Sequence, residues 1–316
     1  MVLLCVGNLA TSPFTRNYQY KMRSTILFLL TFISFSLPAQ NTPVRQLAPG
    51  VFYYFGDELQ QKSANCLWVV FKDYVIVIDA NYPWGAQEII DEIRKTTIKP
   101  IRFVFNTHYH HDHTFGNSVF VDSGATIVST KETATEMQTL GEREWKNGYS
   151  PRSMEGYRRE FPSVTFDERL VFDDGVHRVE LINMGPAHTL GDGVAYLPKE
   201  KILVTGDLCV NGNPWGNNVA DPNVNYDKWL IVLDSLAAWN IKTVVPGHGE
   251  PGTVETLKNQ RSFLADMLTQ VRRGIKAGKS KEQLVEEIDL SRHRVYGQNR
   301  ISIERSIRAM YDKLTL

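Results

Sequence analysis

The sequence predicts a mixed α/β (α+β) fold in which two β-sheets are sandwiched between outer layers of helices. Two observations support this prediction. Apolar, β-branched runs alternate with amphipathic helical segments in the first half of the chain, and the same order of segments recurs in the second half. The chain has 316 residues, 42% of them hydrophobic, which is enough to bury a substantial core.

Runs rich in β-branched and aromatic residues predict strands in both halves. Those in the first half are residues 50–56, 63–80, 101–108 and 125–130, and those in the second half are residues 169–175, 177–185, 193–207 and 241–249. The run over residues 63–80 is interrupted at Lys72 and Asp73, as in a hairpin. Several of these runs end in glycine and polar residues, so we expect polar side chains to gather at the strand ends.

Helical periodicity is clear in three places before the C-terminal region. Residues 85–97 place isoleucines on one face with charges opposite, residues 131–140 follow a predicted cap at Ser129 or Thr130, and residues 225–240 carry a stripe of tryptophan and leucine. The polar residues 141–162 predict a loop or short helix that covers a site. From Val254 onward the pattern is almost wholly helical, and we assign these helices to packing.

The N-terminus predicts a secretory signal rather than part of the fold. Met22 and Arg23 precede a mostly apolar run over residues 26–37, followed by Pro38 and Ala39. The run is short for a membrane span and contains polar residues. We therefore expect residues 1–39 to be an extension and signal peptide with the start at Met22, residues 40–252 to be the main domain, and residues 253–316 to be a helical extension packing on it. The mature protein should be periplasmic or extracellular, with no stable membrane association.

Composition narrows the partners of this chain. Lys and Arg together number 35, as do Asp and Glu, so no bulk charge draws the protein to nucleic acid. Beyond the N-terminal segment only Cys66 and Cys209 remain, which is too few for a framework of disulfides. A small-molecule substrate is the expected partner, and the oligomeric state stays open.

Four histidines and an aspartate occur within six consecutive positions after the predicted strand 101–108. Because residues two apart in an extended chain point the same way, His108 and His110 can face one ion. Where the chain turns toward a helix, Asp112 and His113 can face a second ion. We interpret His111 as a bystander.

Three further candidates lie among glycines at predicted strand ends. His188 occurs in "AHTLGD", Asp207 in "TGDL" and His248 in "PGHG". His177 lies in a strand pattern and His293 in a charged helical region, so both are interpreted as structural.

These motifs resemble those of the metallo-β-lactamase superfamily. "THYHHDH" is similar to its H-x-H-x-D-H signature, the later motifs follow in the family's order, and Asp79 in "VIVIDA" stands at its structural aspartate. The resemblance covers about residues 50–252 and implies a four-layer αββα sandwich. It also implies one metal ion held by His108, His110 and His188, a second held by the remaining ligands, and Asp207 bridging the two. The remaining ligands are Asp112, His113 and His248.

The resemblance implies a dinuclear zinc hydrolase in which a metal-bridging hydroxide attacks an acyl bond, with Asp112 and Asp207 as catalytic residues. A ligand set of nitrogen and carboxylate suits two Zn²⁺, with iron or manganese as alternatives. Many true β-lactamases carry cysteine or serine at the place of Asp207, which favours a broader ester, lactone or thioester hydrolase. A true β-lactamase and a non-catalytic binding protein of the same fold are the alternatives.

Two tryptophans follow strands that carry site aspartates. Trp84 and Trp215 lie on loops after Asp79 and Asp207, where an indole ring can stack on an apolar part of a substrate. The competing interpretation is that each tryptophan packs its own loop. Both are therefore candidate substrate contacts.

Overall fold

The computed structural model describes residues 43–316 except 57–60, 62, 149, 213–218 and 294–299. The predicted signal segment, residues 1–39, and Trp215 lie outside the described residues. The strands are β1 Val44–Ala48, β2 Val51–Tyr54, β3 Cys66–Val70, β4 Val75–Ile78, β5 Ile101–Phe105, β6 Thr126–Thr130, β7 Val164–Phe166, β8 Arg169–Asp173, β9 Arg178–Asn183, β10 Gly193–Leu197, β11 Ile202–Val204, β12 Val210–Asn211, β13 Thr243–Val245 and β14 His248–Gly249. The helices are α1 Pro83–Thr96, α2 His111–Thr114, α3 Asn117–Asp122, α4 Lys131–Lys146, the 3₁₀ turn η2 Gly206–Leu208, α5 Tyr226–Ala237, α6 Val254–Lys276, α7 Lys281–Glu287 and α8 Arg300–Thr315.

The first sheet has seven strands in sequential order, β1 to β7. Strands β1 to β4 pair antiparallel, and β4 to β7 pair parallel through crossover helices. The hairpin predicted around Lys72 and Asp73 is confirmed, since Val70 of β3 pairs with Val75 of β4. In this register Ile78 lies beside Phe105, so β4 and β5 end together at the edge where the histidine-rich loop begins.

The second sheet repeats this plan. Its five strands have the order β13-β11-β10-β9-β8, with β8 to β11 antiparallel and β11 parallel to β13 after the crossover through α5. Strands β12 and β14, which follow β11 and β13 in the sequence, form a separate short parallel pair, and β14 begins with His248. The doubling predicted from the order of segments is therefore present in the structure.

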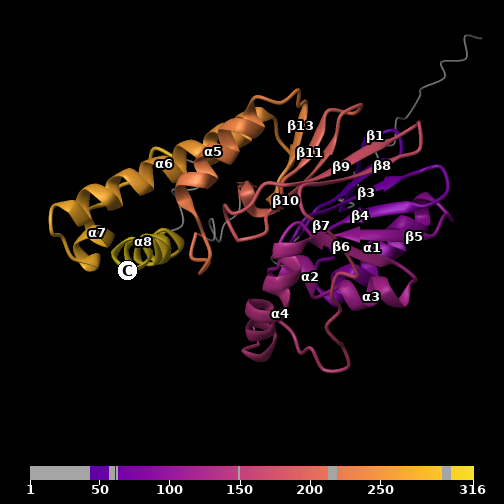
Figure 1. The fold of residues 1–316 in the computed structure, drawn as a ribbon, viewed down its shortest axis with the longest axis horizontal. Helices are drawn as coiled ribbons and strands as arrows, with labels where there is room; N and C mark the ends of the chain where they lie inside the picture. Colours follow the sequence, from indigo (N-terminus) through magenta and orange to yellow (C-terminus); the bar gives the residue numbers. More distant parts are fainter. Residues whose placement is uncertain (1–42, 57–60, 62, 149, 213–218, 294–299) are drawn as a thin grey trace, which may run out of the picture. The chain divides into compact units, whose positions relative to one another are not determined.

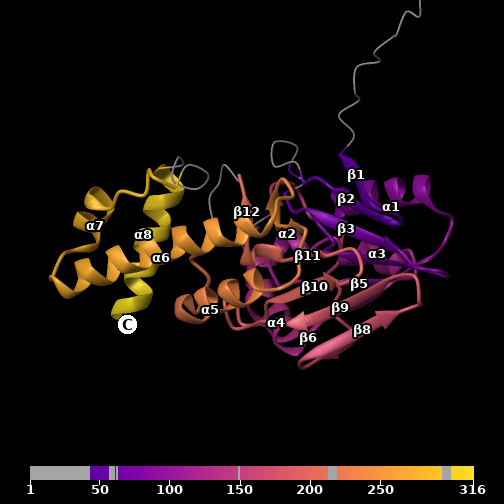
Figure 2. The same ribbon diagram turned by 90° about the horizontal axis from the view of Figure 1, so that it is seen from above.

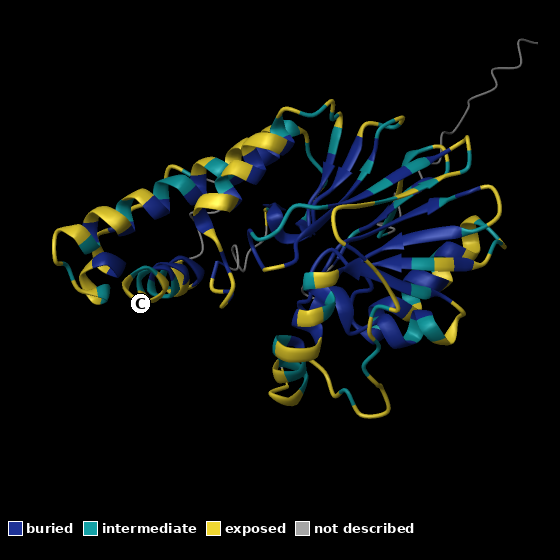
Figure 3. Cartoon of the chain, in the orientation of Figure 1, coloured by how far each residue is buried: buried dark blue, intermediate teal, exposed yellow. Residues whose placement is uncertain are grey.

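Three apolar clusters show the four layers (Figure 1, Figure 2). One lies between the two sheets and includes Ile76, Ile78 and Leu181. A second joins the outer face of the first sheet to α1, with Val75 and Val77 facing the opposite way from their neighbours on the same strand. The third joins the outer face of the second sheet to α5 and α6. Buried strands between helices with exposed outer faces are visible in Figure 3, and the αββα fold is confirmed.

The C-terminal helices continue the third cluster. Helix α6 packs along α5 and contacts β12 and β13, and α8 packs against both α6 and α7. Leu264, Ile303 and Ile307 are among the buried residues that join these helices to the core. Within the described part of the chain, no helix combines the length and apolar character that a membrane crossing requires.

One segment differs from its prediction. Helix α4 does not end near residue 140 but continues through Gly141 to Lys146, so the first residues of the predicted loop 141–162 are helical. Its predicted cap is confirmed at Thr130, whose hydroxyl accepts from the backbone N–H of Thr133. Gly141 therefore lies inside the helix, where a Cβ would be 3.2 Å from Nη2 at the end of the flexible Arg159 side chain, and does not mark a helix end.

Strands β1 and β7 were not predicted. β7 has only three residues, and β1 carries the mixed sequence VRQLA, which has no clear alternation of apolar and polar residues. Each lies at an edge of the first sheet, where pairing with a neighbouring strand decides the conformation more than the local pattern does.

Helix α5 offers a matched test of this packing. Trp229 is fully buried and its indole N–H donates to the carbonyl of Leu208 at 3.0 Å, whereas Ile231 on the same helix is exposed. We expect Trp229→Ala to lower the free energy of unfolding by about 3–5 kcal/mol, because it leaves a cavity. Ile231→Ala should change it by no more than about 0.5 kcal/mol. Urea unfolding followed by circular dichroism measures both, and equal losses would contradict the assigned packing.

Candidate metal centre

The seven predicted ligands meet where the loops of the two sheets converge. His108 and His110 follow β5, Asp112 and His113 lie on α2, and the other three come from the second half of the chain. These are His188 after β9, Asp207 in η2 after β11, and His248 at the start of β14. All seven side chains are buried, and their ligand atoms fall into two groups of closely spaced nitrogen and oxygen atoms.

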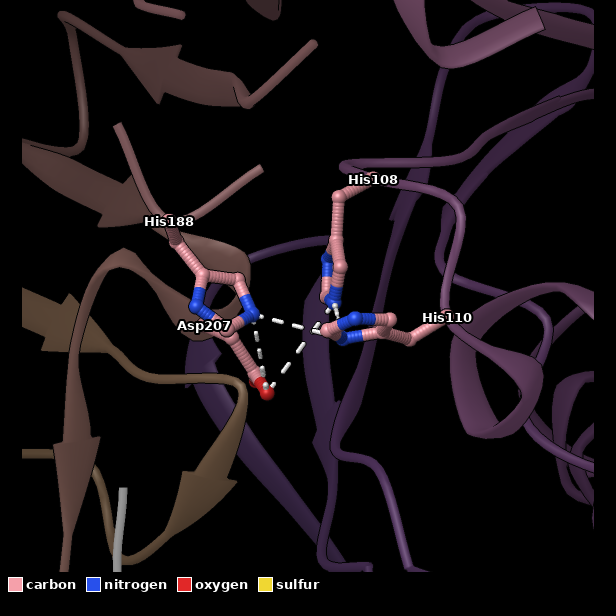
Figure 4. Close-up of side chains that lie close together, drawn as sticks. All are labelled: His108, His110, His188 and Asp207. Atoms are coloured by element: carbon pink, nitrogen blue, oxygen red, sulfur yellow. Dashed lines mark hydrogen bonds and ion pairs between the residues drawn. The ribbon is translucent and has the colours of Figure 1, made fainter. Parts of the chain in front are cut away.

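The first group consists of His108, His110, His188 and Asp207 (Figure 4). The Nδ1 atom of His110 lies 3.0 Å from Nε2 of His108 and 3.3 Å from Nε2 of His188. The Oδ2 atom of Asp207 lies 4.0 Å and 3.9 Å from the same two Nε2 atoms. Three imidazoles and one carboxylate oxygen therefore point at one another, as the ligands of a cation do.

The second group consists of Asp112, His113 and His248. The Oδ2 atom of Asp112 lies 3.3 Å from Nε2 of His248 and 3.9 Å from Nε2 of His113. The Oδ1 atom of Asp207 lies 3.3 Å from each of these Nε2 atoms. Asp207 thus directs one carboxylate oxygen to each group, which places it between them.

Glycine makes this position of Asp207 possible. A Cβ at residue 247 would lie 2.0 Å from Oδ1 of Asp207, so no side chain fits there. The glycine-rich surroundings that pointed to these ligands in the sequence therefore have a steric cause.

The two groups combine ionised carboxylates with buried imidazoles. Burial by itself lowers the pKa of His113, but Asp79, Asp112 and Asp207 outweigh it and raise this pKa to about 10, so a bound cation would replace a proton on His113. Burial lowers the pKa of His188 to about 4 and that of His108 well below its ordinary value, so both imidazoles are neutral and offer a lone pair. Burial by itself raises the pKa of Asp112 and Asp207, but the charges of His113 and His248 outweigh it and hold both pKa values well below the ordinary range. The two carboxylates are ionised.

Two buried atoms at the centre have no hydrogen bond among the described residues. These are Nε2 of His113 and Oδ1 of Asp207, which face each other. An unsatisfied buried donor or acceptor is costly, and a cation between them would satisfy both. The donor set of five imidazoles and two carboxylates thus fits one metal ion in each group.

Four of the five ligand imidazoles have a polar contact on the ring nitrogen that faces away from the metal groups; Nδ1 of His188 has none among the described residues. The Nε2 atom of His110 lies 3.3 Å from Oδ2 of Asp221, which also accepts from the Tyr109 hydroxyl at 2.7 Å. Burial lowers the pKa of His110, but the Asp221 hydrogen bond and nearby carboxylates outweigh it and raise this pKa to about 9. A hydrogen bond on Nε2 leaves Nδ1 for the first group, as outer contacts of metal ligands commonly do.

Asp79 supports the other side of the centre. Its carboxylate accepts from the backbone N–H and the hydroxyl of Thr107 and lies 2.9 Å from Nδ1 of His113. Asp79 itself has a φ of 64°, a conformation rare for a residue with a side chain. The structure thus places Asp79 in the supporting position that the resemblance implied.

Residues outside the predicted set also reach the centre. The hydroxyl of Ser63 donates to Oδ2 of Asp112 at 2.9 Å, and its carbonyl oxygen lies 3.0 Å from Nδ1 of His248. Asp221 in "NVADPN" and Ser63 show no periodic or glycine signal that would have singled them out. Their roles depend on contacts with residues far away in the sequence.

His111 is better connected than a bystander would be. Its Nδ1 lies 2.8 Å from the hydroxyl of Tyr82 and 3.6 Å from Oδ1 of Asp112. Tyr82 stacks on Trp84 at 4.9 Å, and the guanidinium of Arg152 lies 4.9 Å from the Trp84 ring. Trp84 is therefore linked to the metal groups through Tyr82 and His111. Its indole N–H donates to the carbonyl of Gln61 and not to any ligand.

His177 and His293 lie away from both metal groups. His177 contacts Glu200 at 2.7 Å, and His293 contacts Asp266 at 2.9 Å. Cys66 and Cys209 are buried free thiols rather than a disulfide.

Comparisons with known proteins agree with this geometry. Residues 60–248 match the family model described as the metallo-beta-lactamase superfamily. A linear primary-alkylsulfatase of Pseudomonas sp. (strain ATCC 19151) is 26% identical over 251 residues, covering 66% of this chain and 46% of the sulfatase, so this chain spans less than half of that relative. A metallo-beta-lactamase type 2 of Elizabethkingia meningoseptica is 26% identical over 233 residues, covering 65% of this chain and 86% of the relative.

Solved structures show the same fold. The metallo-beta-lactamase from Pontibacter korlensis superposes with a TM-score of 0.57 at 22% identity, covering 70% of this chain and 98% of that one. The DIM-1 metallo-beta-lactamase also gives 0.57, at 21% identity and with 70% and 96% covered. The family match extends over more than half of the chain and includes every residue of both metal groups. The chain belongs to the metallo-beta-lactamase superfamily of metal-dependent hydrolases.

Proposed function

We propose that the protein is an exported hydrolase that uses two zinc ions to cleave an acyl bond in an ester, lactone, thioester or β-lactam. The observation that carries the proposal is the placement of Asp207, whose two carboxylate oxygens face the two histidine groups separately. A protein that only captured a ligand would not require two cation groups joined by one carboxylate. Export rests on the signal pattern of residues 22–39.

In this proposal His108, His110 and His188 would hold one ion, Asp112, His113 and His248 would hold the other, and Asp207 would contribute an oxygen to each group. Imidazole and carboxylate ligands without cysteine suit zinc, and they also accept iron or manganese. Two bound divalent ions supply Lewis-acid polarisation of a carbonyl and a shared water whose pKa falls toward about 7.

The chain's own residues then position the reactants. Ser63 donates to Oδ2 of Asp112 and fixes this carboxylate beside His248 in the second group. Because Asp112 and Asp207 are ionised and buried, they keep their orientation without competition from solvent. No serine or cysteine nucleophile is required.

Trp84 is the proposed contact for the apolar part of a substrate. It is only partly buried, stacks on Tyr82, and lies under the guanidinium of Arg152. Because Tyr82 and Arg152 both lie against the Trp84 ring, a substrate would meet the edge of this ring and the Arg152 guanidinium, which suits a substrate that combines an apolar group with a negative charge. The alkylsulfatase relative makes a sulfate ester the second candidate substrate, and the metallo-beta-lactamase relatives keep the β-lactam in the set.

A substrate screen tests the activity. The metal-free protein and protein reconstituted with zinc, iron or manganese would be assayed on a chromogenic ester, a lactone, a thioester, a cephalosporin and an alkyl sulfate. We expect hydrolysis of at least one acyl substrate that is lost with a chelator and restored by two equivalents of zinc. Two bound zinc ions without turnover of any acyl substrate would contradict the proposal, and turnover of the sulfate alone would identify a sulfatase.

The position of Asp207 predicts a contrast between two aspartate variants. Asp207→Asn should weaken the binding of both ions, because one group loses its oxygen ligand to the amide NH2 and both groups lose the negative charge. Asp112→Asn should weaken the binding of the second ion only. Each affected affinity should fall by more than about 100-fold, beyond the 10–100-fold typical for an outer contact. Metal analysis and zinc titration measure this, alongside turnover. An Asp207→Asn protein that keeps two ions and full activity would disprove the bridge.

A further inference from the structure

We propose that Asn65 is a positioning residue for the second metal group: it fixes His248 against Asp112 and His113 and so sets the affinity of the second ion. The inference rests on the two-ion centre proposed above. Asn65 lies immediately before β3, in the first half of the chain, and is 3% exposed. His248 comes from the second half, so its distance from Asp112 depends on how the two halves are joined at this point.

Asn65 binds the backbone on both sides of His248. Its side-chain Nδ2 donates to the carbonyl of Pro246 at 2.9 Å and to that of Gly249 at 2.7 Å. Its backbone N–H donates to the carbonyl of Gly247 at 2.8 Å. One residue of the first half therefore binds three carbonyls that lie within two residues of His248, those of Pro246, Gly247 and Gly249.

The other end of the amide is tied to the first half. Oδ1 of Asn65 accepts from the backbone N–H of Gly56 at 3.0 Å and lies 2.9 Å from the hydroxyl of Tyr53, which is fully buried. The Tyr53 hydroxyl also lies 3.0 Å from the Gly249 carbonyl and can share its hydrogen between the two. Carbonyls only accept and N–H groups only donate, so these partners allow one orientation of the amide.

The segment that contains Asn65 also reaches the ligands themselves. Ser63 lies two residues before Asn65. Its carbonyl oxygen is 3.0 Å from Nδ1 of His248, and its hydroxyl donates to Oδ2 of Asp112 at 2.9 Å. Residues 63–65 thus contact two members of the second group and hold the loop that carries one of them. The first group has separate supports: Thr107 beside His108, Asp221 beside His110 and Trp229 beside His188.

This separation predicts an effect on one ion more than on the other. Replacing Asn65 by leucine, which has a similar size, removes four side-chain hydrogen bonds. The loop 246–249 is then held by its backbone contacts, by the Tyr53 hydroxyl on the Gly249 carbonyl and by the contact of His248 with Ser63. His248 then loses its fixed distance from Asp112. Outer contacts of metal ligands typically contribute 10–100-fold to affinity, so we expect a loss of roughly that size for the second ion.

The test compares Asn65→Leu with Tyr53→Phe and a control, His177→Gln. The control removes a buried hydrogen bond to Glu200 beside Gly50 and Phe71, away from the ligand loops. Each metal-free protein would be checked for folding by near-UV circular dichroism. It would then be titrated with Zn²⁺ by calorimetry and with Co²⁺ by visible absorption, which reports each ion's coordination.

We expect Asn65→Leu to bind the first equivalent with near wild-type affinity and the second roughly 10–100-fold more weakly. Tyr53→Phe should lower the affinity for the second ion by a smaller factor. If Asn65→Leu does not fold, the result for Tyr53→Phe tests the role of Asn65. His177→Gln should bind both ions as the wild type does. Unchanged second-ion affinity in the folded variants, or an equal loss for both ions, would overturn the role of Asn65. A wild-type protein that binds fewer than two ions would instead overturn the two-ion proposal, and this inference with it.

Discussion

The carboxylate of Asp207 is the point on which the metal centre depends. It is buried, ionised, and shared between two groups of ligands that come from both halves of the chain. Gathering five imidazoles and two carboxylates away from water is unfavourable unless their lone pairs are satisfied. Cations in the two groups would satisfy them.

The scaffold serves this convergence through its doubled plan. In each half, antiparallel strands lead to parallel strands joined by crossovers, so the loops that leave the parallel strands lie at one edge of the sandwich. The apolar layer between the sheets holds these edges together. Histidines placed in such loops are brought together by packing far from the site, while the supports at Asp79, Asp221 and Asn65 set their orientations.

The C-terminal helices join the same core and extend it. Trp229 of α5 is buried in the apolar cluster that includes α6, α7 and α8, and its ring lies 5.1 Å from that of His188. Packing of these helices is thereby linked to a ligand of the first group. The solved relatives cover 70% of this chain, so part of the chain lies beyond the fold they share with it.

The sequence by itself determined most strands and helices and the seven ligand candidates, because strand and helix periods are local and because histidines and aspartates among glycines stand out along the chain. His108, His110, Asp112 and His113 lie within six residues, so their spacing in the sequence was enough to predict that they lie near one another. Only the tertiary structure decided which ring nitrogen of each histidine faces inward and that α4 runs through Gly141. It also revealed Asn65 and Asp221, since their partners lie more than 100 residues away and the hydrogen bonds exist only once the two sheets have packed.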